Sequence, residues 1–211
     1  MTMSRDERRD SGISLVGALP WGTHFCQFYQ TKQDMADIVV PYFRAGLEHN
    51  ELCIWVTSEA LTAEEAREAM ARDVPDFQSY ARRGQVEIFP HTEWYLLGGR
   101  FDLDRTLKMW IEKHDQALAR GYEGLRVSGT PYWIDNKKDW DDFACYEAQI
   151  NKVIGGTKLL VLCTYSLLKC GVVEILDVVR NHEFALAMNQ GKWQIVTMPI
   201  STCTTRGFTR P

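Results

Sequence analysis

The stretch that decides the fold is HFCQFYQTKQDMADIVVPYFRAGLEHNELCIWVTS, residues 24–58. Its first six residues, HFCQFY, form a short apolar and aromatic run that is typical of a strand. Apolar residues then recur at helical spacing from Met35 to Leu47, which predicts a helix. LCIWVTS (52–58) is a continuous β-rich run, as found in strands buried on both faces of a parallel sheet. The stretch therefore predicts strand, helix and strand joined by a crossover.

The same alternation continues along the rest of the chain. Further helices are predicted over 62–84, 103–120, 139–154 and 171–182, and further strands over 85–89, 124–134, 157–166 and 191–198. Strands that alternate with helices of this length imply right-handed crossovers and helices on both faces of one sheet. We therefore expect an α/β fold with three layers, in which a mostly parallel sheet is flanked by helices.

Length and composition limit the class of protein. A chain of 211 residues suits one large domain, which we place at residues 13–200 between a disordered N-terminal tail (1–12) and a C-terminal tail (201–211). The net charge of −4 argues against direct binding of nucleic acid. No apolar run approaches the length of a membrane span, and no signal peptide is evident. We expect a cytoplasmic protein that does not enter the membrane and whose six cysteines are reduced.

Catalytic and nucleotide-binding motifs are missing. The loop after the first strand reads FYQTKQDMAD (28–37) and has no glycine, whereas a phosphate-binding loop needs glycines for close backbone approach. This argues against ATP as a ligand. The sequence has no dinucleotide fingerprint, no nucleophile elbow, no HExxH and no paired Cys/His box. We therefore expect a protein that is not an enzyme.

A ligand site is predicted beyond the carboxyl ends of the strands, where loops of such sheets diverge. Aromatic residues gather there and would suit an apolar or weakly polar small molecule. Glu59 faces the same crevice or caps the next helix, and Arg126 either forms an ion pair at the sheet edge or contacts ligand. The candidate ligand-binding residues are His24, Cys26, Tyr29, Glu59, Trp94, Tyr95, Arg126, Trp133, Cys163 and Tyr165.

His24 and Cys26 also suggest a metal site. They lie two residues apart on one strand, so their side chains share a face. Two ligands do not complete a zinc site, and Cys163 and His182 are the candidates for the remaining ligands. The competing interpretation makes Cys26 a core residue and His24 a hydrogen-bonded histidine at the strand end.

Several phrases together resemble the MEDS domain, a sensory domain of methanogens and methylotrophs. They are GTHFCQFYQTKQDMADIVVPYFRAGLEHNELCIWVTSE, WYLLGGRFD, LRVSGTPYW, and LLVLCTYS followed by ILDVVRNHEFAL, which together extend from about Gly22 to Gln194. The resemblance implies a RecA/KaiC-like core with a degenerate phosphate loop. It also implies sensing of small hydrocarbon or one-carbon derivatives, with a His-x-Cys element on the first strand as a ligand or metal contact, which His24 and Cys26 match.

Three functions compete at this point. The first is a non-enzymatic regulatory module that binds a small molecule and signals through a partner, a histidine kinase or a transcription regulator, because we identify no output segment in the chain. The second is a metal- or redox-responsive switch built on His24 and Cys26, with zinc, haem or another transition metal. The third is a degenerate nucleotide-binding relative of KaiC. A homodimer is our expectation for such a sensor.

Overall fold

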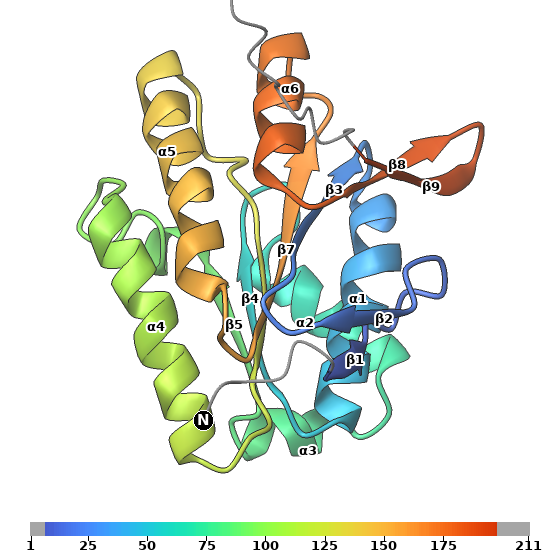
Figure 1. Ribbon diagram of the computed structural model, residues 1–211. Coiled ribbons are helices and arrows are strands. Elements are labelled where there is room, and N and C mark those ends of the chain that lie inside the picture. The colour runs from blue at the N-terminus through green and yellow to red at the C-terminus, as the bar shows by residue number, and fades with distance from the viewer. Residues whose placement is uncertain (1–6, 198–211) are drawn as a thin grey trace, which may run out of the picture.

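A seven-stranded sheet forms the centre of the protein, for which a computed structural model describes residues 7–197 (Figure 1). The strands follow the spatial order β5-β4-β6-β7-β3-β8-β9, and every neighbouring pair is parallel except β8 and β9. This confirms the expected mostly parallel sheet. The strands are β3 (His24–Tyr29), β4 (Leu52–Thr57), β5 (Val86–Pro90), β6 (Leu125–Gly129), β7 (Leu159–Ser166), β8 (Ala185–Asn189) and β9 (Lys192–Val196).

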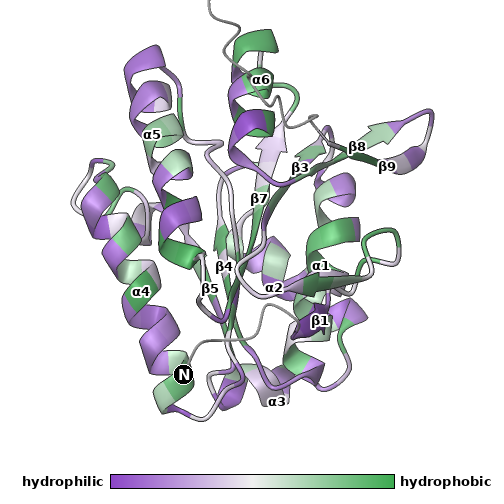
Figure 2. Cartoon of the chain, in the orientation of Figure 1, coloured by the Kyte–Doolittle hydropathy of each residue, from purple (hydrophilic) through white to green (hydrophobic). Residues whose placement is uncertain are grey.

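Helices cover both faces of the sheet, which gives the three expected layers (Figure 1). One face packs against α1 (Lys32–Glu48), α2 (Ala63–Asp73) and α3 (Phe77–Arg82). The other packs against α4 (Leu103–Ala119), α5 (Lys137–Ile154) and α6 (Val172–Asn181). A short 3₁₀ turn, η1 (His91–Glu93), follows β5. Figure 2 shows apolar residues along the strands and on the sheet side of the helices. None of the helices between residues 7 and 197 is long and apolar enough to cross a membrane.

Alternation along the central strands decides which side chains meet. Neighbouring residues of a strand point to opposite faces, and the parallel register pairs Cys26 on β3 with Cys163 on β7. His24, Cys26 and Cys163 therefore point toward α4, α5 and α6. Arg126 on β6 points toward α1, as does Tyr29 at the end of β3.

The N-terminal segment is more ordered than the sequence predicted. Residues 1–12 were expected to be disordered, but β1 (Arg8–Asp10) pairs with β2 (Ala18–Pro20) in a small antiparallel sheet. Arg9 donates to the Glu51 carboxylate at 3.0 Å, which ties this sheet to the main one. The charged composition predicts a solvated tail, because the sequence alone does not show that Arg9 pairs with a buried residue. Residues 1–6 and the predicted tail 201–211 lie outside the described range.

Two secondary-structure predictions need correction. The helix expected over 62–84 is divided into α2 and α3, because the ring of Pro75 disfavours helical geometry at Val74 and Asp76 then has a left-handed φ of 56°. The last strand expected over 191–198 is the second arm of a hairpin. Its first arm, β8, follows closely on α6 and pairs with β3, and we did not predict it.

A substitution in α1 tests the packing of this face against the sheet. Replacing a helical glycine by alanine usually stabilises a helix by about 1 kcal/mol. At Gly46 a Cβ atom would lie 2.9 Å from both the Arg126 side chain and the Cys53 Sγ. We therefore expect Gly46→Ala to destabilise the protein by about 1–3 kcal/mol, as overpacking does, measured by urea unfolding. A stabilised variant would contradict this packing.

Candidate metal centre

Four side chains meet in a buried cluster between the sheet and helices α5 and α6. They are His24 at the start of β3, Glu147 on α5, Cys163 on β7 and His182 at the C-cap of α6, and each offers one ligand atom within 4.8 Å of the others. All four are almost completely buried. The fold thus brings together residues from four elements that are far apart in sequence, including three of the four that we predicted as metal ligands.

The Nδ1 atoms of both histidines are already committed to other partners. Asn151, one turn beyond Glu147, donates its Nδ2 to the carbonyl of Asn181, which leaves its Oδ1 to accept from His24 Nδ1 at 3.0 Å. The Nδ1 of His182 donates to the carbonyl of Val178 at 2.6 Å. With the hydrogen on Nδ1, each ring presents the lone pair of Nε2 to the cluster. Histidines that bind metals are held in this way by a second hydrogen bond.

The distances within the cluster match a four-coordinate metal site. His24 Nε2 lies 3.2 Å from both the Cys163 Sγ and a Glu147 carboxylate oxygen. His182 Nε2 lies 3.3 Å from the same oxygen, and the Cys163 Sγ lies 3.8 Å from the carboxylate. Tetrahedral zinc, with bonds of about 2.0–2.3 Å, places its donor atoms about 3.3–3.7 Å apart. Four of the six donor-atom pairs thus lie at or near these separations, and all four donor atoms lie within 4.8 Å of one another, close enough to bind one ion together.

The cluster has more acceptors than donors. The single thiol hydrogen of Cys163 cannot satisfy two imidazole lone pairs and a carboxylate, and His182 Nε2 makes no hydrogen bond to any residue in the range 7–197. Burial raises the pKa of the Cys163 thiol well above its usual value, and Glu147 raises it further. Burial also lowers the pKa of His182 well below its usual value, with His24 adding to the effect. A bound cation would satisfy all four groups at once.

The pKa of His182 gives a prediction for the metal-free protein. Its folded-state pKa lies below the ordinary value of 6.5, so below pH 6.5 the unfolded chain binds the proton first and stability falls as the pH falls. One such group contributes a slope of about 1.4 kcal/mol per pH unit. Urea unfolding with a chelator at pH 7.5 and 5.5 should therefore differ by about 1.4 kcal/mol in the free energy of unfolding, and His182→Gln should reduce this difference. An equal difference in both proteins would contradict the prediction.

Cys26 and Tyr165 lie next to the cluster. Cys26 shares its face and pairs in register with Cys163, but it is not one of the four clustered residues. Glu147, which we did not single out from the sequence, stands with the three predicted ligands instead. The Tyr165 ring packs edge-on against His182 with a centroid distance of 5.6 Å. All five cysteines in the described part of the chain are free thiols.

The remaining predicted ligand residues do not converge on the cluster. Trp94 and Tyr95 are buried in an aromatic core, where Trp94 packs against Trp110 in a tilted arrangement with ring centroids 4.2 Å apart. Trp133 packs near Tyr95 at 6.0 Å. Glu59 is exposed and lies 3.3 Å from His91, whereas Thr62 caps α2 through its capping box.

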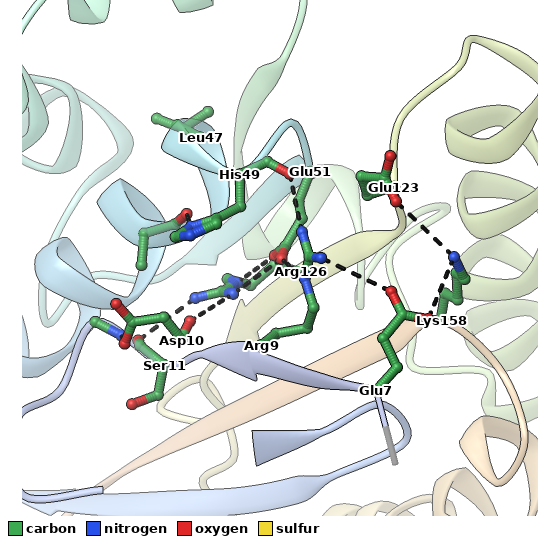
Figure 3. A network of polar contacts seen from close by, with 12 residues as sticks. Glu7, Arg9, Asp10, Ser11, Leu47, His49, Glu51, Glu123, Arg126 and Lys158 are labelled. Carbon is green, nitrogen blue, oxygen red and sulfur yellow. Dashed lines mark hydrogen bonds and ion pairs between the residues drawn. The ribbon is translucent and has the colours of Figure 1, made fainter. Parts of the chain in front are cut away.

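Arg126 and Tyr29 lie on the opposite side of the sheet from the cluster. The guanidinium of Arg126 is fully buried, donates from Nε to Glu51 at 2.6 Å and also reaches the carbonyl of Tyr42 and those of two N-terminal residues (Figure 3). Of the two roles that the sequence left open for Arg126, the geometry shows the ion pair, but β6 lies between β4 and β7 in the interior of the sheet and not at the expected edge. Tyr29 packs in the hydrophobic core under α1.

The start of α1 differs from a phosphate-binding loop. Only Gln30 and Thr31 separate β3 from α1, and the carboxylate of Asp34 accepts the backbone N–H groups of both, at 3.0 Å each. Partial burial acts to raise the pKa of Asp34, but these hydrogen bonds lower it below its usual value. A negative charge therefore sits where a phosphate-binding loop would hold its anion.

Comparisons with known proteins agree with this fold. The family model described as "MEthanogen/methylotroph, DcmR Sensory domain" (MEDS) matches residues 23–183. A KaiC-like protein of Pyrococcus horikoshii OT3 is similar in structure, with a TM-score of 0.63, 17% identity, and coverage of 90% of this chain and 85% of that one. The flagellar accessory protein FlaH of Methanocaldococcus jannaschii is also similar, with a TM-score of 0.54, 12% identity, and coverage of 89% of this chain and 84% of that one. No curated protein matches the sequence. The fold is thus the expected RecA/KaiC-like one.

Proposed function

This chain belongs to the MEDS family of sensory domains, and from that premise we propose that it senses through a transition-metal ion bound by the buried cluster. The observation that carries the proposal is the convergence of four acceptor atoms, two imidazole nitrogens, one sulfur and one carboxylate oxygen, in a buried space. Unpaired acceptors and charges in such a place are costly without a cation. One sulfur, two nitrogens and one oxygen form a donor set that suits Zn²⁺ and neighbouring transition metals.

The ion would connect α6 to the rest of the protein. Only Val178 and Val179 of this helix are buried, and His182 at its C-cap supplies its contact with the cluster. Metal binding would hold His182 against Glu147 of α5 and so favour one position of α6 over others. A sensor works by such a difference in affinity between two states.

The exposed surface of α6 supports a role in output. Apolar side chains remain uncovered on this helix and on the loop before it, and Figure 2 shows apolar colour at the N-terminal start of α6. They are Leu168 (79% exposed), Val172 (75%), Val173 (64%) and Leu176 (40%). Exposed apolar patches often mark contacts between proteins. We therefore place the signalling partner, a histidine kinase or transcription regulator, on this surface.

Cobalt(II) binding followed by visible absorption tests the metal proposal. We expect one Co²⁺ per chain, with a sulfur-to-metal charge-transfer band that Cys163→Ser removes and weaker binding after Glu147→Gln. Cys145→Ser is the matched control, because Cys145 is an exposed cysteine on the same helix as Glu147, and it should leave the spectrum unchanged. A spectrum that does not change in Cys163→Ser, or no uptake of cobalt, would reject the proposal.

A further inference from the structure

A groove of about 450 Å³ lies between the N-terminal parts of α5 and α6. Trp140 lines it and also lines two smaller cavities, of about 20 and 10 Å³. The smaller of these reaches Glu147 of the cluster. A cavity of about 10–15 Å³ holds at most one water molecule, so no ligand reaches Glu147 through this space as the side chains stand, and Trp140 is the residue that lines all three spaces.

One hydrogen bond holds this ring in place. The indole Nε1 of Trp140 on α5 donates to the Asp177 carboxylate on α6 at 3.3 Å. The ring also packs edge-on against Tyr165, at 6.4 Å between centroids. Trp140 is half-buried, so its outward rotation needs no opening of the sheet. Rotation would join the groove to both inner cavities.

The walls of the inner passage suit a particular class of molecule. Phe143, Ala144 and Val178 are apolar and leave little room for a hydrated ion. Tyr165 lines both inner cavities, and its buried hydroxyl has no hydrogen-bond partner among residues 7–197. It offers a small molecule one polar contact near the cluster.

The charge of the groove further limits the class of molecule that can enter it. Four carboxylates but only two ammonium groups line it, and the two lysines are already paired with two of the carboxylates. The groove therefore carries net negative charge, which repels anions at its entrance. The lining charges are Asp135, Asp141, Glu174, Asp177, Lys137 and Lys169.

We propose that this groove is the entry site for a small uncharged ligand with an apolar body and one polar or metal-binding atom. The Trp140 ring acts as the gate that controls entry, and its hydrogen bond to Asp177 holds the gate closed. The ligand enters when the indole leaves the Asp177 carboxylate, and it then reaches Tyr165 and the cluster. The inference rests on the proposed function, because it assigns the cluster as the end of the passage.

The rate at which Cys163 is modified in metal-free protein tests the gate. Methyl methanethiosulfonate is small and uncharged; the thiol of Cys163 loses its proton to buffer base, and the resulting thiolate attacks the sulfenyl sulfur, forms a mixed disulfide and releases methanesulfinate. We expect Trp140→Ala and Asp177→Ala to accelerate this reaction about tenfold, the order expected for one lost hydrogen bond. Asp177→Asn keeps an acceptor for the indole and should react like wild type. The anionic sulfonatoethyl reagent should react much more slowly.

Controls make the result specific. The exposed Cys145 provides an internal reference rate for every variant, and Trp193→Ala, on β9 and half-buried, should not change the rate at Cys163. If Trp140→Ala does not fold, the difference in rate between Asp177→Ala and Asp177→Asn tests the gate instead. Equal rates in wild type and Asp177→Ala would overturn the gate, as would equal rates with the neutral and anionic reagents.

A second measurement separates this inference from the metal proposal. Imidazole, added at a pH well above its own pKa so that the probe is uncharged, should alter the visible bands of the cobalt-loaded protein faster in Asp177→Ala than in Asp177→Asn. If the variants change the rate of Cys163 modification but the protein takes up no cobalt, the gate is supported and the metal proposal is rejected. Cobalt uptake with equal rates in all variants would keep the metal and reject the gate.

Discussion

Replacing Glu51 by alanine is expected to lower the free energy of unfolding by about 3–5 kcal/mol, the usual effect of removing one partner from a buried ion pair. Both Glu51 and Arg126 are fully buried, and the two carboxylate oxygens accept from the guanidinium at 2.6 and 3.1 Å. The same carboxylate also accepts from Arg9 of β1. Its loss leaves the Arg126 charge without a counter-ion and removes the side-chain ion pair that connects the N-terminal strand to Glu51 (Figure 3).

Urea unfolding of Glu51→Ala and of a matched control measures this effect. Glu48 stands three residues earlier, in an exposed ion pair with Arg44, and such pairs contribute roughly 0–1 kcal/mol. Glu48→Ala should therefore unfold almost like wild type. A loss of less than about 1 kcal/mol in Glu51→Ala would show that the buried pair does not hold the N-terminal strand to the sheet.

Adding metal to the stripped protein is expected to produce a stabilisation of similar size. A ligand that binds only the folded state at about a thousand times its Kd adds roughly 4 kcal/mol. For a chain of this length each kcal/mol raises Tm by about 2–4 °C, so zinc should raise Tm by roughly 8–16 °C. The reason is that the ion joins β3, β7, α5 and α6, which otherwise meet through unpaired acceptors.

Thermal unfolding with and without zinc tests this stabilisation. His182→Gln should reduce it strongly, because it removes the only ligand from the end of α6. His114→Gln is the control, since this histidine lies on α4 and is not part of the cluster. The same Tm with zinc and with chelator in the wild-type protein would contradict a metal centre, and an equal rise in His182→Gln would exclude His182 as a ligand.

Much of the fold could be predicted from the sequence, because the physical signals are local. The β4 run is apolar throughout, as a strand needs when helices cover both faces of its sheet. Thr31 and Asp34 form a capping box that starts α1. The features that escaped prediction depend on distant partners: β1 is held by Glu51, and β8 is defined by its pairing with β3.

The site was only partly predictable for the same reason. The His-x-Cys spacing indicates one face of one strand, but it does not show which other elements lie opposite that face. Glu147 left a signal that could have been used, because it stands between Phe143 and Ile150 on the buried side of α5, where a charge needs a partner. The assignment of Cys26 as a ligand is still a prediction, since only its position beside Cys163 is given by the register.

X-ray absorption at the metal edge of the zinc-loaded protein tests the central claim most directly. The proposed cluster supplies one sulfur from Cys163 and three nitrogen or oxygen donors from His24, Glu147 and His182. We therefore predict one Zn–S distance of about 2.3 Å and three Zn–N/O distances of about 2.0–2.2 Å. A shell with two sulfurs would make Cys26 a ligand in place of Glu147, and a shell without sulfur, or protein that holds no zinc, would contradict the proposed metal centre.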